Sequence, residues 1–132
     1  MRLLLDTHLL IWDFMDDANF SAEAISYIED ERNELYYSTA STWEIALKHA
    51  IHPDRMLVTP ERFVQFCEMA EYRNLPIRDE HIKMLEYLKK TDGATNDPFD
   101  RILLAQAKSE GMLLLTHDGL LGRYDEPCLV RV

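Results

Sequence analysis

The sequence predicts an α/β fold with a central, mostly parallel β-sheet, formed as a single domain over residues 1–132. Short apolar runs alternate with longer amphipathic segments, an order that is typical of strands joined by crossover helices. A chain of 132 residues with 47% hydrophobic content can also bury a core of its own. No repeat, low-complexity stretch or long linker divides the chain, so we expect one compact unit.

Four short apolar runs predict the strands of this sheet. Each is too short for a typical helix and is followed by polar or turn-forming residues. The predicted strands are Arg2–Leu5, Leu35–Thr39, Met112–Thr116 and Leu129–Val132.

The segments between these strands have apolar residues at helical spacing, and most begin at a residue that caps helices well. Thr91–Asn96 is polar and contains glycine, so it predicts a loop. The predicted helices are Leu9–Met15, Ser21 to about Arg32, a capping box at Ser41–Glu44 that opens a helix to about Ala50, a helix from Pro60, a helix capped by Asp79, and Asp97 to about Glu110.

Composition excludes several classes of protein. No apolar run reaches the ~20 residues that a membrane span needs, so no membrane association is expected. Cys67 and Cys128 form no Cys-x-x-Cys pair, which argues against a disulfide framework or zinc knuckle and favours the reducing cytoplasm. The net charge of −10 argues against nonspecific nucleic-acid binding through a basic surface.

Acidic residues stand at strand ends and helix starts, which share one edge of a parallel sheet. Asp6 follows the first strand, Glu44 begins a helix, Asp97 and Asp100 begin another, and Asp118 follows the strand near residue 115. We therefore expect these acids to converge at one mouth. Because carboxylate oxygens suit Mg²⁺ or Mn²⁺ better than zinc, the cluster predicts hydrolysis of a phosphodiester with divalent metal.

Each acid also has a purely structural interpretation. Glu44 can complete a capping box, Asp97 can be an N-cap, and Asp100 can interact with the helix dipole. Asp118 is followed by glycine and can form a turn. Asp6 is the hardest to explain this way, because an acid that ends a buried strand needs hydrogen bonds, a cation or solvent. If the acids cluster, their repulsion raises some of their pKa values.

Four segments resemble the motifs of PIN-domain ribonucleases of the VapC toxin type, in the order in which that family has them. The Asp97–Ala107 segment, which begins with Asp-Pro-Phe-Asp-Arg, is the most specific of the four. The segments are Leu4–Trp12, Ser38–Ala46, Asp97–Ala107 and Leu115–Asp118, so the resemblance extends over essentially the whole chain.

This resemblance implies a PIN-like three-layer α/β/α fold and Mg²⁺- or Mn²⁺-dependent RNA cleavage, with a VapB-type antitoxin and a homodimer. It assigns the four family acids to Asp6, Glu44, Asp100 and Asp118, with Asp6, Asp100, Asp118 and Asp97 as metal ligands and Thr7, Thr116 and Arg101 in support. Asp97 is an extra acid of this branch, either a cap or a supporting ligand. A His-Arg pair that commonly precedes the Asp-Pro-Phe-Asp-Arg segment is replaced by Thr95-Asn96 here.

Two other functions fit the residues less well. A regulatory binding module of the phosphoacceptor type has an acidic pocket but needs a lysine late in the chain, and the last lysine here is Lys108, in a predicted helix. A haloacid-dehalogenase-like phosphatase usually has a second acid two residues after its nucleophile, where this chain has His8. For the toxin, we expect an antitoxin that inserts a basic side chain among the acids and covers an aromatic residue such as Trp43 or Phe63.

Overall fold

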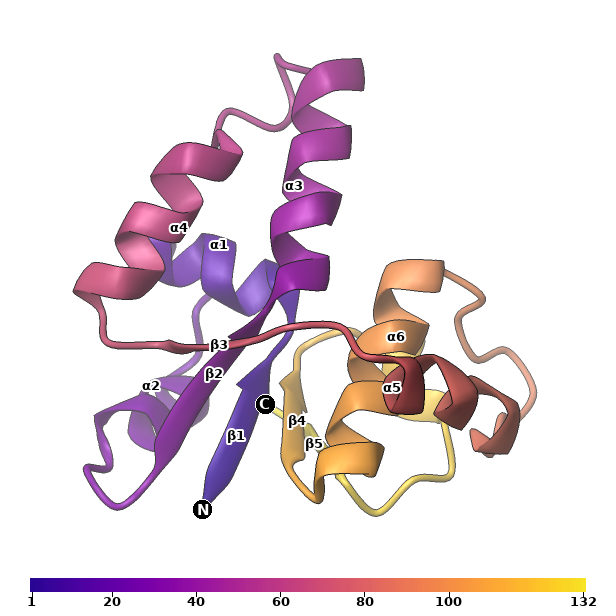
Figure 1. Cartoon of the computed structure of the whole chain (residues 1–132). Helices are drawn as coiled ribbons and strands as arrows, with labels where there is room; N and C mark the ends of the chain where they lie inside the picture. The colour runs from indigo at the N-terminus through magenta and orange to yellow at the C-terminus, as the bar shows by residue number, and fades with distance from the viewer.

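The computed structural model describes all residues from 1 to 132 and contains one five-stranded sheet (Figure 1). Every neighbouring pair of strands is parallel. The order across the sheet is β3-β2-β1-β4-β5, and the strands are β1 (Arg2–Leu5), β2 (Glu34–Ser38), β3 (Arg73–Leu75), β4 (Leu113–Thr116) and β5 (Leu129–Arg131).

The central strand is β1, and the direction of winding reverses beside it. The chain first builds the sheet outward through β2 and β3, and then returns to the other side of β1 to add β4 and β5. Leu3 pairs with Leu113 and Leu5 with Leu115 across this junction. The gap between the ends of β1 and β4 is therefore the topological switch point, where open α/β sheets bind ligands.

Six α-helices and two short 3₁₀ helices connect the strands. Asp6, Ser21, Ser38, Thr59 and Asp97 each cap a helix with a side-chain oxygen that accepts a backbone N–H. The helices are α1 (Thr7–Met15), α2 (Ala22–Glu29), α3 (Thr39–Ile51), α4 (Pro60–Met69), α5 (Asp79–Met84), η1 (Leu85–Tyr87), α6 (Pro98–Glu110) and η2 (Leu121–Arg123).

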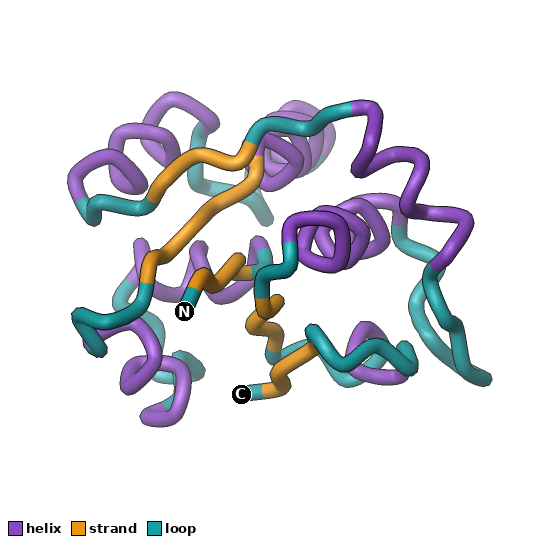
Figure 2. The backbone as a smooth tube through the Cα atoms, turned by 60° about the horizontal axis from the view of Figure 1, so that its bottom comes forward, coloured by secondary structure: helices purple, strands orange, loops and turns teal.

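Helices cover both faces of the sheet, as the alternation of side chains along β1 shows. Leu4 points into a core cluster built with residues of α6, while Leu3 and Leu5 point into clusters on the opposite face, with residues of α1, α2 and α4. Figure 2 shows the strands lying between the helices. The predicted three-layer α/β/α fold with a parallel sheet is confirmed.

Four predicted strands are confirmed, and β3 was missed. β3 has only three residues, Arg73, Asn74 and Leu75, and two of them are exposed because the strand lies at the edge of the sheet. Such a segment has too few apolar residues to show a strand pattern. No helix of the protein has the length and apolar character that crossing a membrane requires.

Four helix boundaries differ from the predictions. The first helix begins at Thr7 rather than at Leu9, because Asp6 caps it. The second helix ends at Glu29 rather than near Arg32. Arg78, not Asp79, is the residue that precedes α5, and its backbone N–H donates to the His81 ring. The third helix begins at Thr39 rather than after Ser41, because the Ser38 hydroxyl already accepts the Ala40 N–H at 2.9 Å.

Candidate active site

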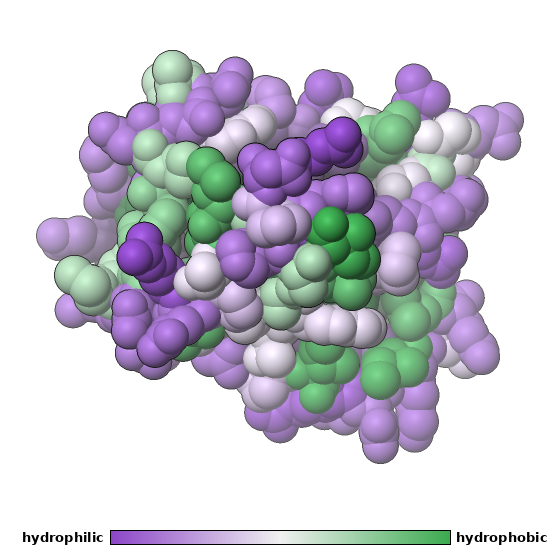
Figure 3. Space-filling model, turned by 90° about the horizontal axis from the view of Figure 1, so that it is seen from above, coloured by the Kyte–Doolittle hydropathy of each residue, from purple (hydrophilic) through white to green (hydrophobic).

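The predicted acids lie at the carboxyl edge of the sheet, the upper edge in Figure 1. Asp6 directly follows β1 and Asp118 lies two residues after β4, so both stand at the topological switch point. Asp97 and Asp100 begin α6, and Glu44 lies in the second turn of α3. Figure 3 looks down on this side of the molecule, where hydrophilic and hydrophobic surface lie next to each other.

Asp6 is the most buried of these acids, with 3% of its surface exposed. One carboxylate oxygen accepts the Leu9 N–H at 2.9 Å and so caps α1, and the other accepts the Thr116 hydroxyl. Burial raises the pKa of Asp6, and these two hydrogen bonds offset part of that shift. No lysine or arginine pairs with this carboxylate.

Thr116, at the end of β4, links the two acids of the switch point. Its hydroxyl donates to Asp6 and accepts the Asp118 N–H at 3.0 Å. Asp118 in turn accepts the N–H groups of Leu120 at 2.7 Å and Leu121 at 3.2 Å through one carboxylate oxygen. The turn that follows β4 is therefore held by Asp118 itself, and the second oxygen of that carboxylate remains available for a ligand.

The start of α6 presents the second pair of acids. Asp97 is the N-cap, with one oxygen accepting the N–H groups of Phe99 at 2.9 Å and Asp100 at 3.1 Å. Thr95 supports both acids: its hydroxyl donates to Asp100 at 3.3 Å and accepts the Asp97 N–H at 3.0 Å. Thr95, which the resemblance marked only as a departure from the family pattern, therefore positions both acids, a function that the motif did not predict.

Glu44 does not complete a capping box with Ser41, because Ser38 is the residue that caps α3, so the prediction of that box is wrong. It is 4% exposed and pairs with Lys48, one turn later, at 2.5 Å. Ser41, the other member of the predicted box, is hydrogen-bonded to the Thr7 hydroxyl at 2.9 Å and so joins α1 to α3. The Glu44–Lys48 spacing of four residues was the available signal for the ion pair.

Arg101 forms no hydrogen bond with the acids. Its guanidinium donates to the Leu85 carbonyl at 3.2 Å, which ties α6 to η1. Thr7 therefore joins α1 to α3 and Arg101 joins α6 to η1, whereas Thr116 contacts Asp6 directly.

The negative charges of the other acids act on the carboxyl group of Asp100. Burial raises the pKa of Asp100 to about 7, and neighbouring charges add to this shift. The acids whose charges contribute are, in decreasing order, Asp97, Asp118, Glu44 and Asp6. The acids therefore lie close enough for their charges to act on Asp100, although desolvation by burial is the larger cause of its raised pKa.

The chemistry of these donors fits a hard divalent cation. All five acids offer only oxygen atoms as ligands. A +2 charge would offset both the desolvation of the buried Asp6 carboxylate and the repulsion that acts on Asp100. In the arrangement seen here, no three acidic, histidine or cysteine side chains are already grouped around one ion position. Asp6, Asp97, Asp100 and Asp118 form no salt bridge within the protein, whereas Glu44 is paired with Lys48.

Fold and site together define a parallel α/β domain with a carboxylate cluster at its topological switch point. The family model described as "PIN domain" matches residues 3–127, and the chain therefore belongs to the PIN domain family. No curated protein sequence matches the chain.

Three solved structures share the fold at low sequence identity. VapBC2 from Rickettsia felis, bound to a promoter DNA fragment, is 12% identical with a TM-score of 0.70, over 100% of this chain and 98% of that chain. VapBC-1 from nontypeable Haemophilus influenzae is 16% identical with a TM-score of 0.61, over 93% and 92%. FitAcB from Neisseria gonorrhoeae is 18% identical with a TM-score of 0.56, over 90% and 89%.

The raised pKa of Asp100 makes a prediction about stability in metal-free buffer. The folded-state pKa of about 7 exceeds the ordinary 3.8, so the stability that protonated Asp100 contributes is lost as pH rises from about 4 through 7. We expect Asp100→Asn to raise Tm at pH 8 by at least about 4 °C, and by less at pH 5. Thermal denaturation in EDTA measures this. The control is Asp92→Asn, an exposed acid of the preceding loop, and an equal gain from Asp100→Asn at both pH values would refute the prediction.

Proposed function

We propose that this protein is a metal-dependent endoribonuclease that acts as the toxin of a VapBC-type toxin–antitoxin pair. The observation that carries the proposal is the convergence of acids from four separate segments at the switch point of the sheet, where burial and the charges of the neighbouring acids together raise the pKa of Asp100. PIN domains are nucleases as a class, and the structures that share this fold are of VapBC and FitAcB proteins.

In this proposal, Asp6, Asp100 and Asp118 hold Mg²⁺ or Mn²⁺, and Asp97 supports them from the start of α6. The bound metal would activate water and stabilise the charge of the leaving oxygen. Thr116 keeps Asp6 and Asp118 in register through its hydroxyl. In the same proposal, Glu44, buried and paired with Lys48, orients a water molecule or the substrate.

The net charge of −10 is compatible with RNA binding if metal neutralises the acids where the phosphate sits. Each divalent ion cancels two charges at that point, and the phosphate then meets a cation rather than carboxylates. The remaining affinity must come from contacts that do not need a basic surface.

The two alternative functions have less support. Lys108, the only lysine late enough for a phosphoacceptor domain, lies in the last turns of α6, whereas the acids surround the first turn. Its ammonium group is already paired with Glu126 at 2.6 Å. His8, which stands where a dehalogenase-like phosphatase has its second acid, is exposed and offers no carboxylate.

The central prediction is metal-dependent cleavage that requires Asp100. Purified protein freed of antitoxin should cut RNA with Mg²⁺ or Mn²⁺ and stop in EDTA, and Asp100→Asn should lower the rate at least about 100-fold. Asp97→Asn should reduce the rate only in part, because asparagine caps a helix nearly as well as aspartate. Gel analysis of end-labelled RNA measures the rates.

The matched control is Asp92→Asn, which removes an equal charge from the loop before α6 and should leave the rate unchanged. Cleavage that persists in EDTA, or that survives Asp100→Asn in a folded protein, would contradict the proposed mechanism.

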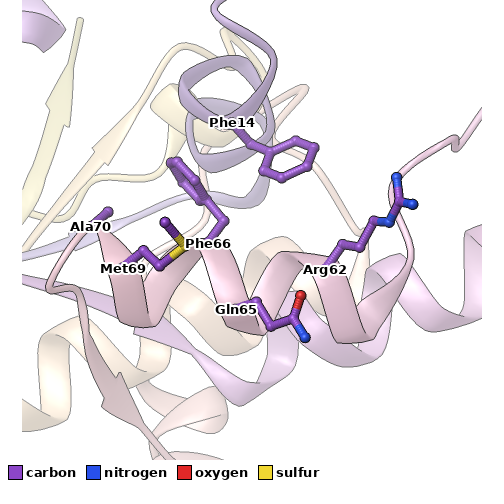
Figure 4. Close-up of a pocket in the computed structure, with 6 residues that line it drawn as sticks. All are labelled: Phe14, Arg62, Gln65, Phe66, Met69 and Ala70. Carbon is purple, nitrogen blue, oxygen red and sulfur yellow. The ribbon is translucent and has the colours of Figure 1, made fainter.

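A groove between α1 and α4 of this protein is suited to bind a helix of the antitoxin (Figure 4). The cavity measures about 480 Å³ and is mostly apolar, with Phe14, Phe66 and Met69 on its walls and Arg62 and Gln65 along its rim. Met69 is 85% exposed, which leaves apolar surface for a partner to cover. Phe63, which we expected an antitoxin to cover, is fully buried in the core, so that expectation is wrong.

For inhibition, we predict that the antitoxin inserts an arginine or lysine among the acids and displaces metal. A guanidinium pairs well with several carboxylates and keeps its charge. Replacing that residue with alanine should restore cleavage while the two proteins remain bound, as measured by RNA cleavage with the co-purified complex. Raising Mg²⁺ should weaken inhibition by the intact antitoxin. If inhibition survives the alanine substitution in the bound complex, the antitoxin acts by steric cover instead.

A homodimer is the expected assembly, and α3 presents a surface for it. Trp43, Leu47 and Ile51 recur every four residues along one side of this helix and are 58%, 42% and 60% exposed. The exposure of Trp43 shows that this side chain is not part of the core. A second copy that covers this stripe would bury all three side chains.

We expect light scattering to show a dimer at micromolar concentration. Leu47→Glu should shift the protein toward monomer, because a charge would be buried in the interface. Ile82→Glu introduces the same charge at an equally exposed position on α5 and is the control. A monomeric wild-type protein would reject the dimer, and an unaffected Leu47→Glu dimer would reject this surface.

A further inference from the structure

We propose that Trp12, His8 and His117 form a subsite that stacks one unpaired nucleobase of the RNA beside the scissile phosphate. These residues, with Asp118, line a cavity of about 190 Å³ at the carboxyl edge of the sheet. The inference rests on the proposed nuclease function and adds to it the site by which an acidic protein holds its substrate.

The geometry is that of an aromatic recess rather than a filled core. The rings of Trp12 and His117 meet edge to face, with centroids 5.2 Å apart and an interplanar angle of 67°. On the other side, the His8 ring lies 6.3 Å from Trp12 at an angle of 58°. The three rings therefore form the walls of the cavity, and none of them is stacked in parallel on another, so a planar ligand can lie against a ring face.

The fold brings these rings together across the switch point. His8 and Trp12 are one turn apart on α1, so they lie on the same side of the helix that follows β1. His117 immediately follows β4, which pairs with β1. The aromatic recess and the carboxylates are thus built on the same two strand ends.

The recess is largely preformed. The Nδ1–H of His117 donates to the Val132 carbonyl at 2.6 Å, since a carbonyl can only accept, and this bond fixes the plane of the ring. Trp12 is half-buried and packs against the core cluster that contains Leu9 and Leu115. His8 is exposed and remains free to adjust to a ligand. Rigid rings lose little entropy when a ligand binds.

Charge and size favour a nucleobase as the occupant. Asp118 is both a wall of the recess and a candidate metal ligand, so a nucleotide whose phosphate reaches the metal has its base within reach of Trp12. The volume of about 190 Å³ is smaller than that of ~300–1,000 Å³ pockets for drug-sized ligands, and suits a single ring system. Stacking on a π face needs no basic residue, which is the kind of contact that a chain of net charge −10 requires.

The test combines a change in the protein with a change in the RNA. With an RNA that the wild-type protein cleaves, each nucleotide near the cut site is replaced in turn by a base-free nucleotide. At one position next to the cut, we expect kcat/KM to fall roughly tenfold, the size of effect that loss of one stacked base produces. Trp12→Leu should lower cleavage of the intact RNA by a similar factor, and should make the base-free substitution at that position harmless.

Matched variants separate stacking from folding. Trp12→Phe keeps an aromatic face and should retain most activity, while His8→Ala, at an exposed position, should lower kcat/KM several-fold without changing Tm. Circular dichroism verifies that each variant is folded. If the base-free nucleotide has the same effect on wild type and on Trp12→Leu, the subsite is refuted while the nuclease function stands.

Two other results also decide the matter. If Trp12→Leu cleaves intact RNA normally but binds the antitoxin less tightly, the recess is a protein contact and the subsite is wrong. If the wild-type protein cleaves no RNA with Mg²⁺ or Mn²⁺, the proposed function itself fails.

Discussion

The burial of the Asp6 carboxylate at the end of the central strand is the constraint on which this site depends. A carboxylate that is 3% exposed needs compensation, and the protein supplies only the Leu9 N–H and the Thr116 hydroxyl. Thr116 can reach Asp6 only if β4 lies beside β1 in the observed register, with Leu5 opposite Leu115. The same register places the turn after β4 so that Asp118 joins the cluster. One hydrogen bond therefore connects the topology of the sheet with the electrostatics of the acids.

Much of the fold could be predicted because the strands next to the centre are nearly all apolar. Both faces of β1 and β4 are covered, so Leu3, Leu4 and Leu5 all face a core and the run stands out in the sequence. The edge strand β3 shows no such pattern, since only Leu75 of its three residues is buried. Helix starts were predicted well where a single capping residue stands before the helix, as at Ser21 and Asp97. At Ser38 and Ser41 the sequence contained several capping residues in a row, and spacing alone did not identify the one that caps.

Sequence order placed the acids at the correct edge of the sheet, but it could not show how each one is satisfied. Asp6, Asp97 and Asp118 accept backbone N–H groups and are also available to a ligand, so structural and functional interpretations are not exclusive. Lys48 beside Glu44 followed from a four-residue spacing, whereas the bond between Thr7 and Ser41 joins positions 34 residues apart. The sequence did not predict the aromatic recess for the same reason, because His117 lies beside Trp12 only when β1 pairs with β4. Long-range contacts of this kind depend on register, which a residue pattern does not encode in a single chain.

The pairing of β1 with β4 also has a consequence for how the chain folds while the ribosome is still synthesising it. Asp6 and Thr116 are 110 residues apart, so the central strand cannot pair with β4 until at least that much further chain has been synthesised. Chains that depend on such distant pairing complete their structure late. A nascent chain therefore carries Asp6 and Glu44 well before Asp118 exists, and a chain cleaved before β4 lacks both Thr116 and Asp118. The carboxylate cluster can therefore be complete only after the chain has been made as far as Asp118.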